Sequence, residues 1–431
     1  MFQKTIWMIL NKGQTMKICI KRGTDEIGGC CAELATDTTR ILLDVGTPLS
    51  SMEEDKPLDM YKVPCPGLYA DEPPAVDAIF ITHGHPDHYG LLPLVNPAIP
   101  VYMSKTLHDI LIKIQPLLPG DFDISHLNIR QIAPDESVQI GDLTITARPV
   151  DHSPAAYAYE ITDGKKRAVY TGDIRFHSNQ AWKSWSLADK VHAPDYLIME
   201  GTRLSRSDED GKEKFPSEQA VRDGLTDLLG NSGKLAFISL SSQNLDRLCS
   251  VISACARTKR TFVIDPYTAA LLDIFNEFSS KVPTADMASC IRIYYGISEK
   301  ISAKMIDAGL FYKHKAQKIS KEEILAAPEK YIIKYNWKLA RWLLDNGLSD
   351  YDFIYSMWTG YLSRQKTWDA YKDRLVEIHT SGHAAVDDLQ EFVKKIAPQK
   401  IIPIHTECKN EYESVFGVPT LVLTDNEWAE V

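Results

Sequence analysis

Short apolar runs separated by glycine and polar turns dominate the first 200 residues. Apolar runs of about four to eight residues bounded by turn signals are typical of strands. A helical spacing of apolar residues at 104–118, followed by Pro119 and Gly120, predicts a helix that ends there. The expected strands of this part lie at 17–22, 31–35, 40–44, 78–82, 143–150, 156–161, 168–171 and 196–199.

The pattern changes after residue 200, where a polar stretch at 205–214 leads into alternating strand and helix signals. This alternation is typical of a parallel sheet covered by helices. The segments expected to alternate are strands at 235–239 and 261–264, helices at 244–256 and 268–278, and later strands at 400–404 and 421–423.

The composition narrows the class of protein. The 431 residues are 44% hydrophobic and 25% charged, as in an ordinary globular protein. The net charge of −10 excludes a uniformly basic chain, although a local basic patch stays open. The eight cysteines form no CxxC pair and indicate reduced thiols. No segment approaches the roughly 20 apolar residues of a membrane span, so we expect a cytoplasmic protein without membrane contact.

The strongest chemical signal directly follows the expected strand at 78–82. Residues 82–88 read Thr-His-Gly-His-Pro-Asp-His, which puts three imidazoles and a carboxylate within six positions. A strand end can bring these groups to one point, and zinc prefers such donors. A polar turn that is rich in histidine by chance is the alternative, but unpaired histidines have no packing value. We therefore interpret His83, His85, Asp87 and His88 as metal ligands.

This segment resembles the HxHxDH motif of the metallo-β-lactamase superfamily, and later residues agree with the family in order. Asp44 ends a strand where the family has an aspartate that supports the metal loop. His152 matches the third ligand segment, and Asp173 matches the carboxylate that bridges two zinc ions. Taken alone, His152 would be an ordinary surface or core histidine, and Asp173 a turn residue.

Three further segments resemble the β-CASP family of nucleic-acid-processing enzymes, and the sequence of motif B is most similar to that of ribonuclease J. They are motif A at 199–202 (MEGT), motif B at 379–384 (HTSGHA) and motif C at 403–407 (PIHTE). The resemblance covers about residues 17–410 and implies a four-layer αββα metallo-β-lactamase fold with an inserted β-CASP α/β domain and an active site in the cleft between them. The implied parts are an N-terminal extension (1–16), a first metallo-β-lactamase part (17–200), the β-CASP domain (201–377) and a C-terminal metallo-β-lactamase part (378–431).

The resemblance also implies a role for each site residue, starting with two zinc or manganese ions per chain. Two such ions lower the pKa of water toward about 7 and so supply a hydroxide nucleophile. His383 would protonate the departing 3′-oxygen and Glu200 would orient it, and Asp87 is counted with them as catalytic; a merely buried, hydrogen-bonded His383 is the alternative. The implied ligands are His83, His85 and His152 for one ion, Asp87, His88 and His405 for the other, and Asp173 as the bridge.

The expected substrate is single-stranded RNA, because the DNA-specific members of the family carry valine where this chain has His405. A pocket for a 5′-monophosphate, like that of ribonuclease J, would comprise Ser241, Ser242, His379 and Ser381. Serines that only cap a helix would explain the first two as well. Between 299 and 341, ten basic and five acidic residues alternate with aromatics. This is either an RNA-facing surface or, as we slightly favour, a charged helical face over buried aromatics.

The sequence therefore predicts a zinc-dependent ribonuclease. We expect a minimal member of the family, without the C-terminal domain of ribonuclease J or the KH modules of archaeal relatives. The dimer and tetramer modes linked to that C-terminal domain are therefore not expected here, although a homodimer stays open. Two alternatives also stay open: a DNA nuclease or other hydrolase of this fold, and a non-catalytic RNA-binding subunit. The three β-CASP motifs argue against a small-molecule hydrolase, and the complete set of ligands argues against a subunit without catalysis.

Overall fold

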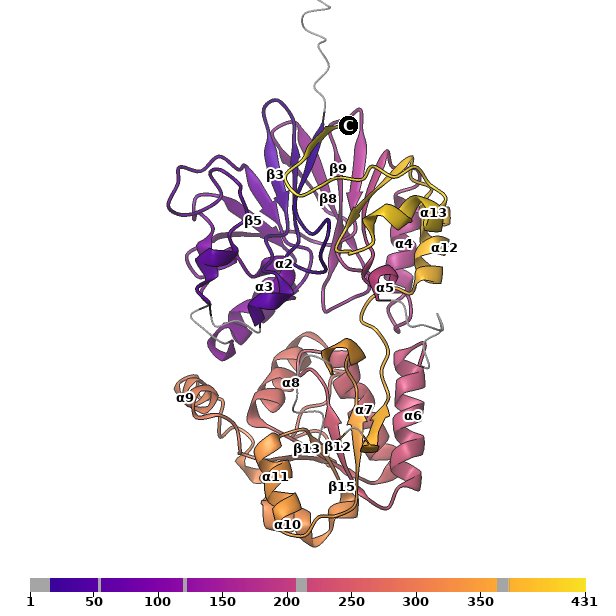
Figure 1. Cartoon of the computed structure of the whole chain (residues 1–431). Helices are drawn as coiled ribbons and strands as arrows, with labels where there is room; N and C mark the ends of the chain where they lie inside the picture. The colour runs from indigo at the N-terminus through magenta and orange to yellow at the C-terminus, as the bar shows by residue number, and fades with distance from the viewer. Residues whose placement is uncertain (1–15, 53–55, 119–121, 207–214, 363–370, 372) are drawn as a thin grey trace, which may run out of the picture. The chain divides into compact units, whose positions relative to one another are not determined.

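The computed structural model describes residues 16–52, 56–118, 122–206, 215–362, 371 and 373–431. It divides into two compact units (Figure 1). The first unit comprises Met1–Leu111, Asp123–Ser207 and Gly382–Val431, and the second comprises Ile112–Phe122 and Asp208–Ser381. Residues 1–15 of the expected N-terminal extension and most of the polar stretch at 205–214 lie outside the described residues.

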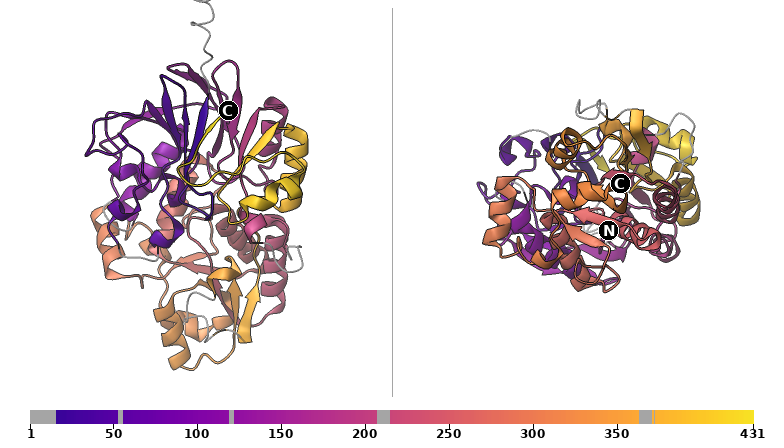
Figure 2. Two further views of the ribbon diagram at one scale, coloured as in Figure 1. Left: turned by 45° about the horizontal axis from the view of Figure 1, so that its top comes forward. Right: turned by 90° about the horizontal axis from the view of Figure 1, so that it is seen from below.

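The first unit contains two sheets. One is mixed and contains, in spatial order, β19 (Trp428–Glu430), β1 (Lys17–Arg22), β2 (Cys31–Ala35), β3 (Arg40–Leu43), β4 (Ala78–Phe80), β5 (Pro100–Met103) and β6 (Asn128–Gln131). The other contains β18 (Lys400–Ile404), β11 (Tyr196–Glu200), β10 (Arg167–Tyr170), β9 (Tyr157–Thr162), β8 (Leu143–Pro149) and β7 (Ser137–Ile140). The pairing of β19 with β1 brings the C-terminal segment beside the first strand (Figure 2).

The two sheets pack face to face because their strands alternate apolar side chains toward a shared core. Ile18 and Ile41 of the first sheet belong to the same buried cluster as Ile145, Tyr170 and Ile198 of the second. A separate cluster joins the far face of the second sheet to helices on that side. Helix α3 lies at the other side of the pair (Figure 1), which completes the predicted αββα layers.

Helices of the first unit are short apart from three. The α-helices are α2 (Pro86–Tyr89), α3 (Lys105–Ile114), α4 (Trp182–Lys190), α5 (Thr202–Ser205), α12 (Val386–Ile396) and α13 (Tyr412–Phe416). In α12, Leu389, Phe392 and Val393 are buried against the second sheet, while the opposite side carries acidic and basic residues. This amphipathic pattern explains why the outer layer is helical.

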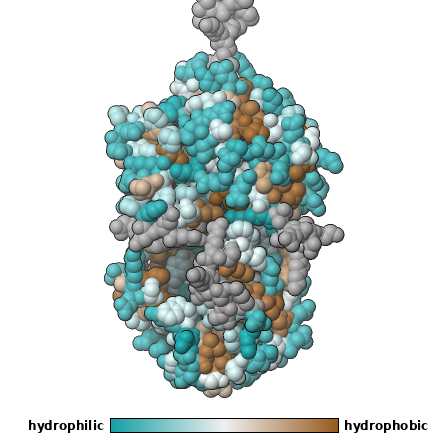
Figure 3. All heavy atoms as spheres, in the orientation of Figure 1, coloured by the Kyte–Doolittle hydropathy of each residue, from teal (hydrophilic) through white to brown (hydrophobic). Residues whose placement is uncertain are grey.

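The second unit is a parallel α/β sheet, as the alternating pattern predicts. Its strand order is β14 (Ile291–Ile293), β13 (Thr261–Ile264), β15 (Tyr331–Lys334), β12 (Leu235–Ser239), β16 (Tyr351–Tyr355) and β17 (Leu375–Glu377). Its α-helices are α6 (Glu218–Asn231), α7 (Leu245–Thr258), α8 (Pro266–Phe278), α9 (Glu299–Asp307), α10 (Lys321–Ala326) and α11 (Trp337–Asp345). Hydrophilic side chains dominate the face of the molecule drawn in Figure 3.

Most expected strands are present with shifts of one or two residues, but the strand predicted at 421–423 is wrong. Leu421 donates a single backbone hydrogen bond to Ile401, and the neighbouring Thr420 forms an isolated bridge there. A turn at 425–426 follows, and the strand that does pair with β1 lies after it, at Trp428–Glu430. Among the residues that the structure describes, no helix is long and apolar enough to cross a membrane.

Candidate metal centre

The loop that carries the histidine motif is clamped at the end of β4. The backbone of Val45 donates to the carbonyl of His88, and Gly46 lies so close to this loop that a Cβ there would come within 1.7 Å of the Asp87 carbonyl oxygen. Only glycine allows this approach. The short helix α2 then holds Asp87 and His88 on one turn, with His85 just before it.

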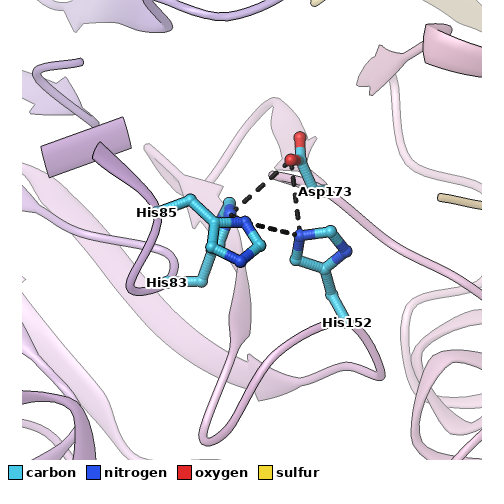
Figure 4. A group of neighbouring side chains, drawn as sticks. All are labelled: His83, His85, His152 and Asp173. Carbon is cyan, nitrogen blue, oxygen red and sulfur yellow. Dashed lines mark hydrogen bonds and ion pairs between the residues drawn. The ribbon is translucent and has the colours of Figure 1, made fainter. Parts of the chain in front are cut away.

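Four side chains from three strand ends converge on one position (Figure 4). His85 Nδ1 lies 3.0 Å from His83 Nε2 and 3.1 Å from His152 Nε2. Asp173 Oδ2 lies 3.5 Å from both of these Nε2 atoms. His83 and Asp173 follow β4 and β10, and His152 follows β8, so the tertiary structure joins the residues that the sequence predicts as one set.

Hydrogen bonds on the outer nitrogens fix the tautomers of this group. His152 Nδ1 donates to the carbonyl of Gly382 at 2.9 Å. In the neutral ring, Nε2 therefore carries no proton and presents a lone pair. His83 Nδ1 lies 2.9 Å from Thr82 Oγ1, whose single proton goes to Asp44, so Nδ1 donates and Nε2 again carries a lone pair. The Nδ1 atom of His85 can donate its one proton to only one of these two Nε2 atoms. The lone pairs of His83 and His152 therefore face one another across a buried space, an arrangement that costs free energy unless a cation lies between them.

A second group of possible metal donors also lies next to Asp173. His88 Nε2 is 3.3 Å from Asp173 Oδ2, and His405 Nε2 is 3.3 Å from Asp87 Oδ2. The outer nitrogens are again fixed, His88 Nδ1 by Asp44 at 2.7 Å and His405 Nδ1 by Thr202 Oγ1 at 2.7 Å. His88 Nε2 and Asp173 Oδ1 are buried atoms to which the described residues give no hydrogen-bond partner. The donors present therefore fit a second cation.

Burial and charge set the protonation of these groups. Burial lowers the pKa of His83 and of His152 well below the ordinary value, so both rings are neutral, as ligands must be. Burial opposes the charged form of His88 as well, but Asp173 and Asp44 outweigh it and raise the pKa of His88. Burial would raise the pKa of Asp173, but His405 and His88 outweigh it and hold that pKa well below the ordinary range.

Glu200 and His383 form a pair beside the two positions. Glu200 ends β11 and is buried, and its Oε1 accepts from the backbone of Ile174 at 2.8 Å. Its Oε2 lies 2.9 Å from His383 Nδ1. Burial lowers the pKa of His383, but Glu200 and Asp173 outweigh it and raise the pKa above the ordinary value. Because Nδ1 is held by Glu200, Nε2 is the atom of His383 that can exchange a proton with a substrate.

Asp44 forms hydrogen bonds with residues next to both groups of possible metal donors. It has a left-handed backbone, with φ of 60°, an arrangement that strains most residues other than glycine. Its carboxylate accepts hydrogen bonds from the Thr82 backbone at 2.8 Å, from Tyr170 Oη at 2.9 Å and from His88 Nδ1 at 2.7 Å. This one carboxylate therefore orients His88 directly and His83 through the hydroxyl group of Thr82.

The residues predicted to bind a phosphate lie in the second unit. Ser242 Oγ shares a hydrogen bond of 2.9 Å with Thr268 Oγ1, and Ser241 is exposed at the turn before α7. His379 Nδ1 lies 3.2 Å from Arg247 Nη1, and Ser381 ends the unit. The alternative that a serine caps α7 is wrong, because the side chain of Asn244 accepts from Arg247 N and caps the helix.

Several residues of the centre escaped the sequence analysis. Thr82 and Thr202 fix ring nitrogens through their hydroxyl groups, and the Gly382 carbonyl fixes His152. The Sγ atom of Cys30 lies with the ring nitrogens of His88 and His405, and burial raises the pKa of that thiol well above the ordinary value. A lone threonine or cysteine gives no signal in one sequence, since such residues are common everywhere.

The basic segment at 299–341 matches neither expectation completely. Phe311 is buried, as a charged face over an aromatic core predicts, but Tyr312 and Trp337 are 59% and 62% exposed. Lys313 and Lys334 are paired with Asp273 and Asp265, which removes part of the local positive charge.

Comparisons with known proteins agree with this geometry. Residues 39–224 match the Beta-lactamase superfamily domain, and residues 371–412 match the Zn-dependent metallo-hydrolase RNA specificity domain. The chain is 24% identical to the Probable RNase MJ4 of Methanocaldococcus jannaschii over 91% of this chain and 93% of that protein. It is 22% identical to Ribonuclease J2 of Bacillus subtilis, over 92% of this chain and 70% of that one.

Two further relatives bear on length and fold. The chain is 22% identical to the Transcription termination factor FttA of Methanothermobacter thermautotrophicus over 89% of its own length, and it spans 66% of that relative. A crystal structure of a protein of unknown function from Enterococcus faecalis superposes with a TM-score of 0.76 at 22% identity, covering 97% of this chain and all of the other. This likeness supports the fold.

Replacing Asp44 by Asn should weaken metal binding without unfolding the chain. The amide keeps the size of the carboxylate but turns an NH₂ group toward donors, so His88 loses its acceptor and its fixed tautomer. Loss of such a partner reduces metal affinity by about 10–100-fold. Titration of the metal-free protein with zinc would measure the change. Unaltered affinity with a native circular dichroism spectrum would contradict this role.

Proposed function

This chain belongs to the metallo-β-lactamase superfamily and to its ribonuclease J-like β-CASP family, and on that premise we propose that it is a zinc-dependent ribonuclease that hydrolyses phosphodiester bonds of single-stranded RNA. The observation that carries the proposal is the set of ring nitrogens whose lone pairs converge beside Asp173. The match to an RNA specificity domain at 371–412, which includes His383 and His405, supports RNA as the substrate.

The first proposed zinc position has His83, His85 and His152 as ligands, and Asp173 lies between it and the second. The second has Asp87, His88 and His405. When bound, such ions acidify water and offset the charge that builds on a phosphoryl group. Manganese is the alternative, because imidazole and carboxylate donors suit both metals.

The remaining chemistry is assigned to the Glu200–His383 pair. The 3′-oxygen of ribose is a poor leaving group and needs a proton as its bond to phosphorus breaks. His383 would deliver that proton from Nε2, since Glu200 holds Nδ1 at 2.9 Å. Glu200 itself is held by the backbone of Ile174, so the donor has a fixed direction.

Binding of the 5′-terminal phosphate of the RNA is assigned to four residues, His379, Ser381, Ser241 and Ser242. Arg247 can only donate, so the Nδ1 of His379 accepts and the proton of this ring stays on Nε2. An N–H donor suits a phosphate oxygen. A 5′-monophosphate would satisfy such donors, whereas a hydroxyl group would leave them unpaired.

The metal content is the first test. Analysis of protein purified without chelators should give close to two zinc or manganese ions per chain. Asp173→Ala should reduce this number and abolish turnover, because the carboxylate lies 3.3–3.5 Å from ring nitrogens of both positions. Full activity in a metal-free sample would contradict the proposal.

Two histidine variants separate the proton donor from the ligands. His383→Ala should keep its metal and lower kcat by about 10²–10⁴-fold, the usual loss for a missing general acid. His405→Ala should lose metal from the second position. The measurement combines metal analysis with steady-state kinetics on end-labelled RNA. If His383→Ala loses metal as readily as His405→Ala, the two roles are wrongly assigned.

Substrate choice is tested with labelled oligonucleotides. Single-stranded RNA should be cut in preference to DNA of the same sequence, and 5′-monophosphate RNA faster than 5′-hydroxyl or 5′-triphosphate RNA. Affinity should fall as salt rises, because phosphate contacts supply much of the binding. Equal rates for the three 5′ ends would contradict the proposed phosphate pocket and indicate an endonuclease. A preference for DNA would contradict RNA as the substrate.

A further inference from the structure

Arg247 is a charged side chain with no exposed surface in the second unit. It is the third residue of α7, and its Nη2 forms an ion pair of 2.8 Å with Oε1 of Glu218, the first residue of α6. Its Nε also donates to Glu218 at 3.1 Å, and Ser250 donates to the same carboxylate. A buried guanidinium needs such partners, because an unpaired charge would be expensive to desolvate.

The other nitrogens of Arg247 hold the motif B segment. Nη1 donates to the Ser356 carbonyl at 3.1 Å and to His379 Nδ1 at 3.2 Å. Nη2 donates to the Thr380 carbonyl at 3.1 Å. The planar fork of one side chain therefore fixes both a ring and a backbone carbonyl at the start of this segment.

The next residues are fixed again, this time in the first unit. The Gly382 carbonyl accepts from His152, His383 is bonded to Glu200, and the Ala384 backbone donates to Ile174 at 2.8 Å. Only Ser381 lies between Thr380 and Gly382. A change of the backbone at Thr380 therefore has one residue over which to relax before it reaches the carbonyl that orients His152 and the ring of His383.

We propose that Arg247 is a positioning residue for His383: it fixes the Thr380 carbonyl and thereby the direction from which His383 delivers its proton. The inference rests on the proposed function, because it takes His383 as the proton donor. Arg247 itself need not touch the substrate. A misplacement of a reacting group by about 1 Å can lower a rate about 10²-fold, so an effect on turnover is expected without loss of the fold.

The test compares two leaving groups on the same RNA. One substrate is an ordinary oligoribonucleotide, and the other carries a 5′-terminal p-nitrophenyl phosphate ester, whose phenolate departs without a proton. Arg247→Lys keeps the positive charge but loses the planar guanidinium group that donates to several partners at once. It should lower kcat on ordinary RNA at least tenfold and leave kcat on the ester within about twofold of the wild type. His383→Ala should show the same split, and metal content should stay at the wild-type value.

Arg260→Lys is the matched control. Arg260 is also buried in the second unit, but its guanidinium donates to the carbonyls of Leu229, Ser232 and Tyr331, which are outside motif B. It should lower thermal stability without a dependence on the leaving group. Ser356→Ala is the second variant, for use if Arg247→Lys fails to fold. It removes the Ser356 hydroxyl group, which lies 2.5 Å from Arg247 Nη1, and leaves no charge unpaired. A smaller loss of kcat on ordinary RNA is expected, again without a loss on the ester.

Each outcome has a distinct meaning. Equal losses on both substrates, or a change in KM alone, would overturn the positioning role and leave Arg247 as a structural residue. Wild-type kcat on both substrates in Arg247→Lys and in Ser356→Ala would overturn it as well. Failure of the proposed function would instead appear in the wild-type protein, as an absence of metal-dependent cleavage of ordinary RNA.

Discussion

One buried carboxylate, Asp44, joins the two sheets of the first unit to the candidate metal centre. It accepts from Thr82 next to β4, from Tyr170 on β10 and from His88 in α2, so two sheets and the metal loop share one anchor. A carboxylate without exposure is tolerated only when its lone pairs are satisfied. The contacts of Asp44 therefore contribute both to the packing of the sheets and to the orientation of the site residues.

A second constraint is electrostatic. The inner nitrogens of His83 and His152 present lone pairs to one another and to Asp173, while their outer nitrogens are committed to Thr82 and Gly382. Such an arrangement opposes folding when the centre is empty. Packing of the two sheets and helix α12 must supply the free energy that holds these groups in place, which is typical of functional sites.

Motif B is held by one kind of interaction in the second unit and by another in the first. Charge pairing in the second unit fixes His379 and Thr380 through Arg247, whereas hydrogen bonds around the metal centre fix Gly382 and His383. Only Ser381 connects the two stretches. A motif that reads as one continuous segment is thus two anchored stretches that meet at a single residue.

The sequence by itself predicted individual strands and the parallel sheet of the second unit from its apolar runs and turn residues. It indicated the family, and with it the αββα layers, through the His-Gly-His-Pro-Asp-His segment and motifs A, B and C, because such runs and motifs are local signals. It also predicted His152, Asp173 and His405 through their order in a family pattern. Only the tertiary structure decided which atoms face one another, the left-handed backbone at Asp44 and His405, the pairing of β19 in place of 421–423, and the partners Thr82, Thr202 and Arg247. The reason is that hydrogen-bond partners tens to hundreds of residues apart leave no periodic trace in a single sequence, whereas strands and metal motifs do.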